Sequence, residues 1–82
     1  MNRERRRQVN IARETIKRAK DMLVGANRLL DRTADEEQDA LDNTPEAFQE
    51  TDRYYDSEKA AETLEESVSA LEDIITDLGE IL

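Results

Sequence analysis

Apolar and small residues recur along the first half of the chain at alternating intervals of three and four positions. The series is Val9, Ala12, Ile16, Ala19, Leu23, Ala26 and Leu30, and Met22 and Leu29 widen it on one side. Such spacing places the residues on one stripe of an α-helix, which has about 3.6 residues per turn. The alanines alternate with the larger residues, so we expect this stripe to approach a second helix closely.

A second run with the same periodicity lies toward the end of the chain. Its members are Ala61, Leu64, Val68, Leu71, Ile75, Leu78 and Leu82, with Ala60, Ile74 and Ile81 on the adjoining position. Three apolar positions per heptad form a stripe wider than one partner helix covers. We therefore expect a homodimer in the form of a four-helix bundle. The residues expected at its interface are Leu71, Ile74, Leu78 and Ile81.

The sequence between the two runs predicts a turn. Asn43 is suited to end the first helix in the left-handed conformation, and Pro45 pushes Thr44 out of the helical region. Thr44 is then expected to cap the second helix, with Pro45 at its first position. The predicted fold class is all-α, a long antiparallel helical hairpin in a single domain covering 1–82. Its helices are expected at about 3–42 and 45–82 around a turn at 43–45, and caps at Asp56 and Ser57 could interrupt the second helix within 52–57.

A turn centred near Pro45 also predicts the register of the hairpin. Facing residues should have numbers that add up to about 91, which aligns the two apolar stripes. The expected pairs are Leu30 with Ala61, Leu23 with Val68, Ile16 with Ile75, and Val9 with Leu82.

Charge is distributed unevenly along the chain. Formal charge is +6 over residues 1–32, −8 over 33–57 and −7 over 58–82, which together give the net −9. The charged fraction of 40%, with only 4% aromatic residues, is typical of long exposed helices. In an antiparallel hairpin the basic first helix lies beside the acidic second helix, so we expect the two to compensate each other.

Four arginines near the N-terminus have two interpretations. Arg3, Arg5, Arg6 and Arg7 could contact phosphate groups of a nucleic acid, or they could pair with the acidic end of the second helix. The net charge of −9 repels a polyanion, so pairing within the hairpin is favoured over direct nucleic-acid binding.

The sequence lacks the residues on which most enzyme sites depend. It contains no histidine and no cysteine, which removes the usual general base, thiol nucleophile and zinc ligands. Its two glycines are isolated, so no phosphate-binding glycine loop is present. The acidic residues from Asp35 to Asp42 lack the spacing of a calcium loop. We expect a protein that is not an enzyme and that binds no metal or cofactor.

The aromatic residues and the densest acidic segment both lie near the predicted turn. Phe48, Tyr54 and Tyr55 could close the open end of the seam, or they could form a contact patch, and the two roles are compatible. The candidate partner-binding residues are Glu36, Asp39, Asp42, Phe48, Arg53, Tyr54 and Tyr55. A partner with a basic surface is expected.

The region around the turn resembles a group of small acidic helical-hairpin proteins encoded by bacteriophages and other mobile elements. The residues that carry the resemblance are Glu36, Glu37, Gln38, Ala40, Asp42, Asn43, Pro45, Glu46 and Gln49, followed by the acidic amphipathic helix. Thr44 replaces an expected apolar residue and Phe48 an expected leucine, and the basic N-terminal segment lies outside the resemblance. The resemblance covers roughly residues 35–82 and implies two long helices joined by an Asp-Asn-x-Pro-Glu turn.

Three function classes follow from these features. The first is a protein-interaction module of a phage or mobile element that modulates a host or phage protein through its acidic apex. The second is a structural dimeric bundle. The third is an acidic nucleic-acid mimic that occupies a basic groove. No apolar run has membrane-spanning length, and a cytoplasmic location is expected because the chain has no cysteine and no apolar leader.

Overall fold

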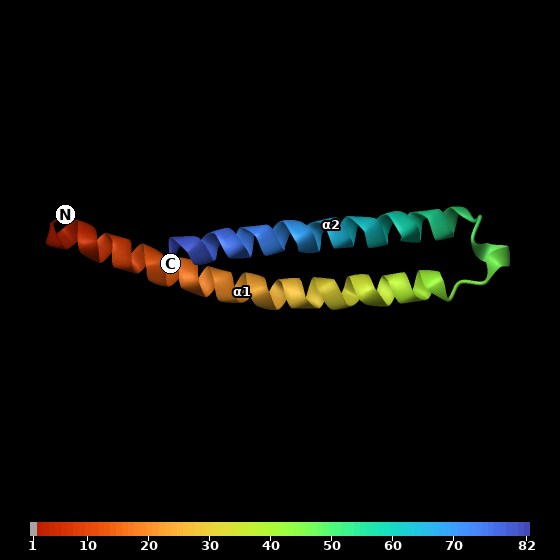
Figure 1. Ribbon diagram of the computed structural model, residues 1–82, viewed down its shortest axis with the longest axis horizontal. Helices are drawn as coiled ribbons and strands as arrows, with labels where there is room; N and C mark the ends of the chain where they lie inside the picture. The colour runs from red at the N-terminus through yellow and green to blue at the C-terminus, as the bar shows by residue number, and fades with distance from the viewer. Residues whose placement is uncertain (1) are drawn as a thin grey trace.

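The computed structural model describes residues 2–82 and is an extended hairpin of two long helices (Figure 1). Helix α1 spans Arg3–Asp42, a short 3-10 helix η1 spans Glu46–Phe48, and helix α2 spans Asp52–Ile81. The Cα atoms extend over 69 × 16 × 15 Å. The predicted all-α hairpin is therefore confirmed. Neither long helix has a stretch apolar enough to span a membrane, within the residues described.

Helix α1 has the bounds that the sequence predicts, but it ends differently. The Oδ1 atom of Asn2 caps its start by accepting from the Arg5 amide at 2.8 Å. Asn43 follows its last turn with φ −93° and ψ 2°, so the expected left-handed ending is wrong. Instead the Asn43 side-chain amide donates at 2.8 Å to the Asp39 carbonyl, which also accepts from the Asn43 backbone amide at 3.0 Å.

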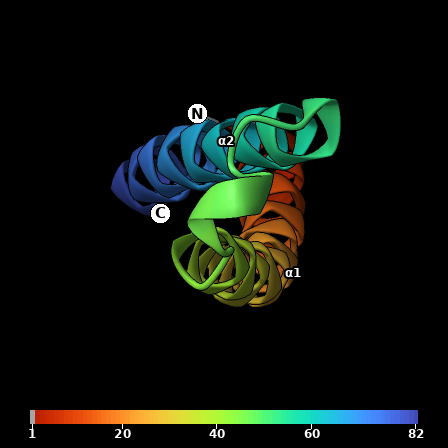
Figure 2. The same ribbon diagram turned by 90° about the vertical axis from the view of Figure 1, so that its right-hand side faces the viewer.

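The connection between the helices is longer than the predicted turn at 43–45. Pro45 has φ −58° and ψ 142°, an extended conformation, and it precedes η1 rather than opening α2. Thr44 donates to the Ala40 carbonyl at 2.9 Å and does not cap α2, because that helix begins only at Asp52. Thr51 takes that role, accepting from the Tyr54 amide at 3.2 Å, and α2 then runs without a break through 52–57. Viewed along the hairpin, η1 lies across its end between the two helices (Figure 2).

The longer connection shifts the register of the hairpin by about one helical turn. The Asn27 side chain reaches the Val68 carbonyl, and the Arg13 guanidinium reaches the Leu82 carbonyl. Facing residue numbers therefore add up to about 95 rather than the expected 91. Consequently Val9 does not face Leu82, and the predicted pairs are each displaced by about four residues.

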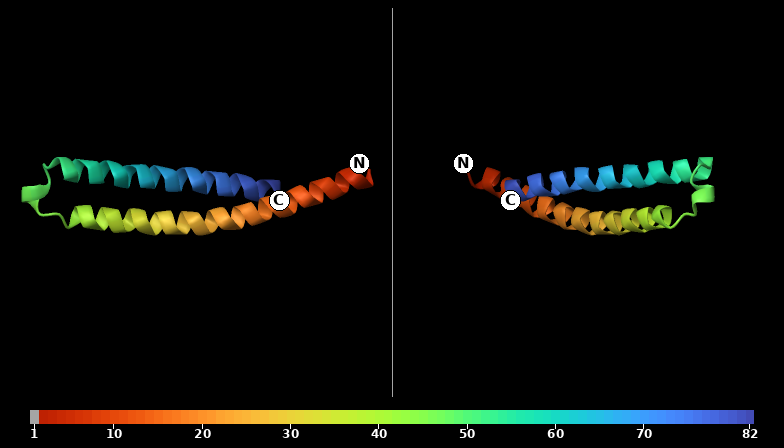
Figure 3. Two further views of the ribbon diagram at one scale, coloured as in Figure 1. Left: turned by 180° about the vertical axis from the view of Figure 1, so that it is seen from behind. Right: turned by 45° about the vertical axis from the view of Figure 1, so that its right-hand side comes forward.

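The shifted register lengthens the part of α1 that has no partner helix. Residues 3–12, here called the arm, continue past the last residue of α2 for about 15 Å at 1.5 Å per residue (Figure 1, Figure 3). The expected pairing of the arginines with the acidic end of α2 is therefore wrong. Within residues 2–82 the one ion pair is Arg7 with Glu4, at 3.8 Å within the arm itself.

The seam between the helices uses a different set of positions on α1 from the one predicted. Ala19 and Ala26 are exposed, and the positions between the larger seam residues are taken by Lys20, Asn27 and Ala34. Buried apolar side chains are few and small, as expected for a narrow seam. They are Ala34, Leu41, Ala61 and Val68, and the buried polar residue is Asn27.

Candidate functional site

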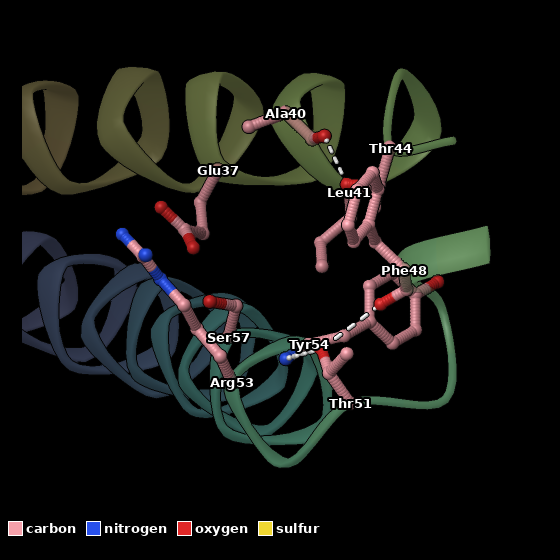
Figure 4. A pocket seen from close by; sticks show the side chains of 9 residues that line it. All are labelled: Glu37, Ala40, Leu41, Thr44, Phe48, Thr51, Arg53, Tyr54 and Ser57. Atoms are coloured by element: carbon pink, nitrogen blue, oxygen red, sulfur yellow. Dashed lines mark hydrogen bonds between the residues drawn. The ribbon is translucent and has the colours of Figure 1, made fainter. Parts of the chain in front are cut away.

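A hollow of about 400 Å³ opens at the apex, here meaning the connection 43–51 and the adjoining helix ends. Side chains from α1, the connection and α2 converge on it (Figure 4). Its lining consists of Glu37, Ala40, Leu41, Thr44, Phe48, Thr51, Arg53, Tyr54 and Ser57. We call this the apex hollow.

Local hydrogen bonds fix the backbone around the apex hollow. The Gln49 amide group donates to the Thr44 carbonyl at 3.1 Å, which ties η1 to the end of α1. The Thr51 hydroxyl donates to the Phe48 carbonyl at 2.9 Å, and the same oxygen accepts from the Tyr54 amide. Together with the backbone bonds of η1, they hold the wall of the hollow at the start of α2.

The three aromatic residues occupy different environments. Tyr54 is half-buried and lines the apex hollow, whereas Phe48 lines it while remaining 59% exposed. Tyr55 is 53% exposed and is not part of the lining. Its ring meets that of Tyr54 edge to face, with centroids 6.1 Å apart. Of the two alternatives, closing the seam suits Tyr54 and a contact patch suits Phe48.

Two opposite charges flank the apex hollow. The Glu37 carboxylate and the Arg53 guanidinium point toward one another across it (Figure 4), but they are too far apart to form an ion pair. Neither charge is therefore neutralised by the other. Glu37 was absent from the sequence-based candidates, although its spacing of four residues from buried Leu41 places it on the seam side of α1.

The acidic candidates on α1 lie outside the apex hollow. Glu36, Asp39 and Asp42 are all exposed, and their spacing of three residues turns each about 60° from the previous one. Asp42 accepts from the Gln38 amide group at 3.0 Å. These carboxylates thus surround the outer side of α1 and contribute charge near the apex without forming one row.

The four residues expected at a dimer interface divide into two pairs. Leu71 and Leu78 are half-buried, within the seam of the hairpin itself. Ile74 and Ile81 are exposed by 47% and 54%. On α1, Met22 and Leu29 are also exposed, by 76% and 55%. Large apolar side chains therefore remain uncovered on both helices.

These exposed residues share one face of the hairpin. A groove on the opposite face is lined by Arg28 and Asp31 of α1 together with Glu72 and Thr76 of α2. At about 100° per residue, Met22 and Leu29 lie on the other side of α1 from that groove, and Ile74 and Ile81 lie on the other side of α2. We call this surface the apolar face. Its members are Met22, Ala26, Leu29, Ala70, Ile74 and Ile81, all exposed.

The apex hollow opens on the same side as the apolar face. Ala40, which lines the hollow, follows Met22 by 18 residues, and this spacing corresponds to about five complete turns. Met22 and Ala40 therefore point in the same direction from α1, and the apolar face and the apex hollow form one continuous surface.

The arm carries apolar as well as basic side chains. Val9 and Ile11 are exposed by 42% and 55%, because α2 ends before it reaches them. Val9 lies in the direction of the seam, whereas Ile11 precedes Met22 by 11 residues, about three turns, and extends the apolar face. The arm thus has apolar side chains in two directions that the hairpin does not cover.

Within residues 2–82, no group of three or more acidic side chains is arranged to hold a metal ion. The structure has three further surface features: the apex hollow, the apolar face and the arm. Comparisons with models of protein families, with curated proteins and with solved structures find no match to this chain.

Proposed function

We propose that this chain is a non-enzymatic protein-interaction module whose acidic apex binds a basic segment of a partner protein. The observation that carries the proposal is the apex hollow, because it combines an apolar interior with acidic surroundings. Leu41, Phe48 and Tyr54 supply the apolar surface. The segment 33–57 that contains them has a formal charge of −8.

The chemistry of the apex defines the occupant it would recognise. A hollow of about 400 Å³ has room for apolar side chains that insert from a partner. Carboxylates around it favour arginine or lysine beside those side chains, and they accelerate association with a basic partner. An amphipathic helix with one apolar and one basic side satisfies both conditions.

A titration with matched peptides tests this proposal. The probe is a fluorescent helical peptide of about 15 residues with leucines on one side and arginines on the other, and its control replaces every arginine with glutamate. We expect binding of the arginine peptide only, weakening as salt rises. Phe48→Ala and Tyr54→Ala should each weaken binding at least tenfold, because both rings line the hollow.

Tyr55→Ala is the matched control, since the Tyr55 ring lies beside the site without lining it. It should leave the peptide affinity within about twofold of the parent chain. Equal binding of both peptides, or equal losses in all three variants, would show that the apex hollow is not the recognition site.

A structural role as a dimeric bundle is the second candidate, and the apolar face favours it. The nucleic-acid mimic has less support, because Glu36, Asp39 and Asp42 point in different directions and do not reproduce a row of phosphates. A phage or mobile-element source belongs to the first proposal through the resemblance of the segment around Pro45. In that setting the partner would be a host or phage protein.

A further inference from the structure

We infer that the basic segment filling the apex hollow is the arm of a second copy of this chain, in an antiparallel dimer formed through the apolar face. The inference rests on the proposed function, because it names the partner of the same hollow. In this arrangement the two hairpins stack face to face with their apexes at opposite ends. Each arm then lies beside the apex of the other copy.

The exposed area of the hairpin is large enough to supply an interface. A compact protein of 9.5 kDa exposes about 5,000 Å², whereas this chain exposes 6719 Å². The excess of about 1,700 Å² is roughly twice what one partner contributes to a standard interface. A second copy seated on the apolar face would cover the large side chains that account for part of it.

The apolar face is self-complementary along α1. Met22 and Leu29 lie at equal distances on either side of the midpoint between Gly25 and Ala26. A two-fold axis through that midpoint, perpendicular to the helices, places Met22 of one copy on Leu29 of the other. Small residues then lie at the axis, where two α1 helices cross most closely.

The same axis also relates complementary positions on α2. The register places Ala70 beside Gly25, so the axis passes near Ala70 on this helix. Mirrored through Ala70, Ile74 of one copy lies level with residue 66 of the other and Ile81 with residue 59, one position from Ser67 and Ala60 respectively. On the apolar face each large side chain therefore lies close to a small one, which is the arrangement that interdigitating helices require.

Gly25 provides an independent indication of close approach. A glycine within a helix costs about 1 kcal/mol relative to alanine. A Cβ atom added at Gly25 would meet nothing within 4 Å in the hairpin, so packing within one copy does not require the missing side chain. Close packing of a second α1 helix at this position would account for it.

The charge distribution selects the antiparallel arrangement. The two-fold axis that relates Met22 to Leu29 brings Ile11 of one arm onto Ala40, at the apex hollow of the other copy. The arm carries four arginines and one glutamate, whereas the segment 33–57 carries −8. A parallel dimer would instead place the two arms together and the two acidic apexes together, and like charges would repel at both ends.

Distance measurements between spin labels test the arrangement, and the absence of native cysteine permits a single label. Glu46→Cys places the label in η1, which is exposed. After sedimentation has established a dimer, we expect a label separation of about 60 Å, from about 20 residues on each side of the axis at 1.5 Å per residue. A separation below about 30 Å indicates parallel hairpins packed at ordinary helix spacing and would overturn the inference, as would a monomer.

A substitution at the axis provides the second measurement. Gly25→Leu should favour the helix of a single copy but weaken dimerisation at least tenfold, because its side chain occupies the crossing point. Unchanged dimer affinity would contradict the inference. The matched control is Ser69→Leu, at an exposed position of α2 outside the apolar face, which should leave dimer affinity unchanged.

The outcomes separate this inference from the proposed function. If the apex binds the arginine peptide while the chain is monomeric or parallel, the function stands and the second copy is not the partner. If the labels lie about 60 Å apart but Phe48→Ala and Tyr54→Ala leave peptide binding unchanged, the antiparallel dimer stands and the apex is not a recognition site. If both hold, the peptide and the arm should compete for the hollow.

Discussion

Asn27 is the polar side chain buried in the seam, and its hydrogen bond to α2 marks the register of the hairpin. Its Nδ2 atom donates to the Val68 carbonyl at 3.4 Å, whereas its buried Oδ1 atom has no protein partner. An unpartnered buried acceptor costs about 1–3 kcal/mol. A polar residue at a seam position can still be useful, because it favours the single register in which it is bonded.

Asn27→Leu should therefore stabilise the protein by about 1–2 kcal/mol, since it removes the unpartnered oxygen and adds apolar contact. The measurement is the midpoint of urea unfolding at fixed protein concentration. Asn10→Leu, on the exposed arm, is the control and should raise the midpoint only by the small gain in helix propensity. A lower midpoint for Asn27→Leu would mean that Oδ1 has a partner such as a bound water.

The position of Asn27 also shows why the α1 seam could be predicted only in part. The larger residues Ile16, Leu23 and Leu30 were placed correctly, because they belong to the seam under either choice of intervening positions. Hydrophobicity favours the alanines at those intervening positions. The structure instead buries Ala34 and Leu41 near the apex. The same seven-residue spacing, followed back along α1, places Asn27 and Lys20 in the seam in place of the alanines.

The start of helix α2 depends on one threonine. Thr51 is the residue whose hydroxyl bonds both the Tyr54 amide and the Phe48 carbonyl, so it caps α2 and holds η1 at the same time. Thr44, with Pro45 after it, had the stronger cap signal in the sequence. That signal was misleading because Pro45 leads into η1 and not into α2, and sequence alone does not rank one threonine over another.

Thr51→Ala should cost about 1 kcal/mol of unfolding free energy, the usual loss at an N-cap. Thermal unfolding followed by circular dichroism provides the measurement. Thr63→Ala is the matched control, because the Thr63 hydroxyl bonds the Lys59 carbonyl within the same helix and caps nothing. Equal effects of the two substitutions would show that α2 does not depend on the Thr51 cap.

The one-turn shift in register arises from the length of the connection between the helices. Residues 43–51 form the connection where a turn at 43–45 was expected, and the added residues displace α2 along α1. Hydrophobic periodicity does not exclude either register, because both stripes repeat every seven residues and α2 offers apolar residues at many levels. The length of the connection decides, and the hydrogen bonds that set this length are not visible in the pattern.

The register shift carries the N-terminal arginines further from the acids of α2. In the expected register, with Val9 facing Leu82, Arg7 would have lain only two residues beyond the end of α2. In the structure they extend beyond α2, and the ion pair of Arg7 with Glu4 is local to the arm. Basic charge thus lies at one end of a 69 Å rod and acidic charge at the other. Two such rods attract each other when they lie side by side and antiparallel, because the basic end of each is then beside the acidic end of the other.

Charge reversal at the two ends provides a test of this attraction. One variant carries glutamate at Arg3, Arg6 and Arg7, and the other carries lysine at Glu36, Glu37 and Asp56. In the antiparallel dimer each variant alone places like charges at both contacts, so self-association should weaken at least tenfold at low salt. Mixing the two variants restores opposite charges at both ends, and the mixture should form heterodimers with an affinity near that of the parent chain.

Salt provides the control for the charge-reversal experiment. Screening acts over about 10 Å at 0.1 M ionic strength and about 3 Å at 1 M, so the differences between homodimers and heterodimers should shrink as salt rises. Sedimentation at both ionic strengths measures this. In a parallel dimer the arginine-to-glutamate variant would bring acidic arms together in place of basic ones, so its self-association would match that of the parent chain. Unimpaired homodimers of this variant at low salt would therefore exclude the arm as the partner of the apex hollow.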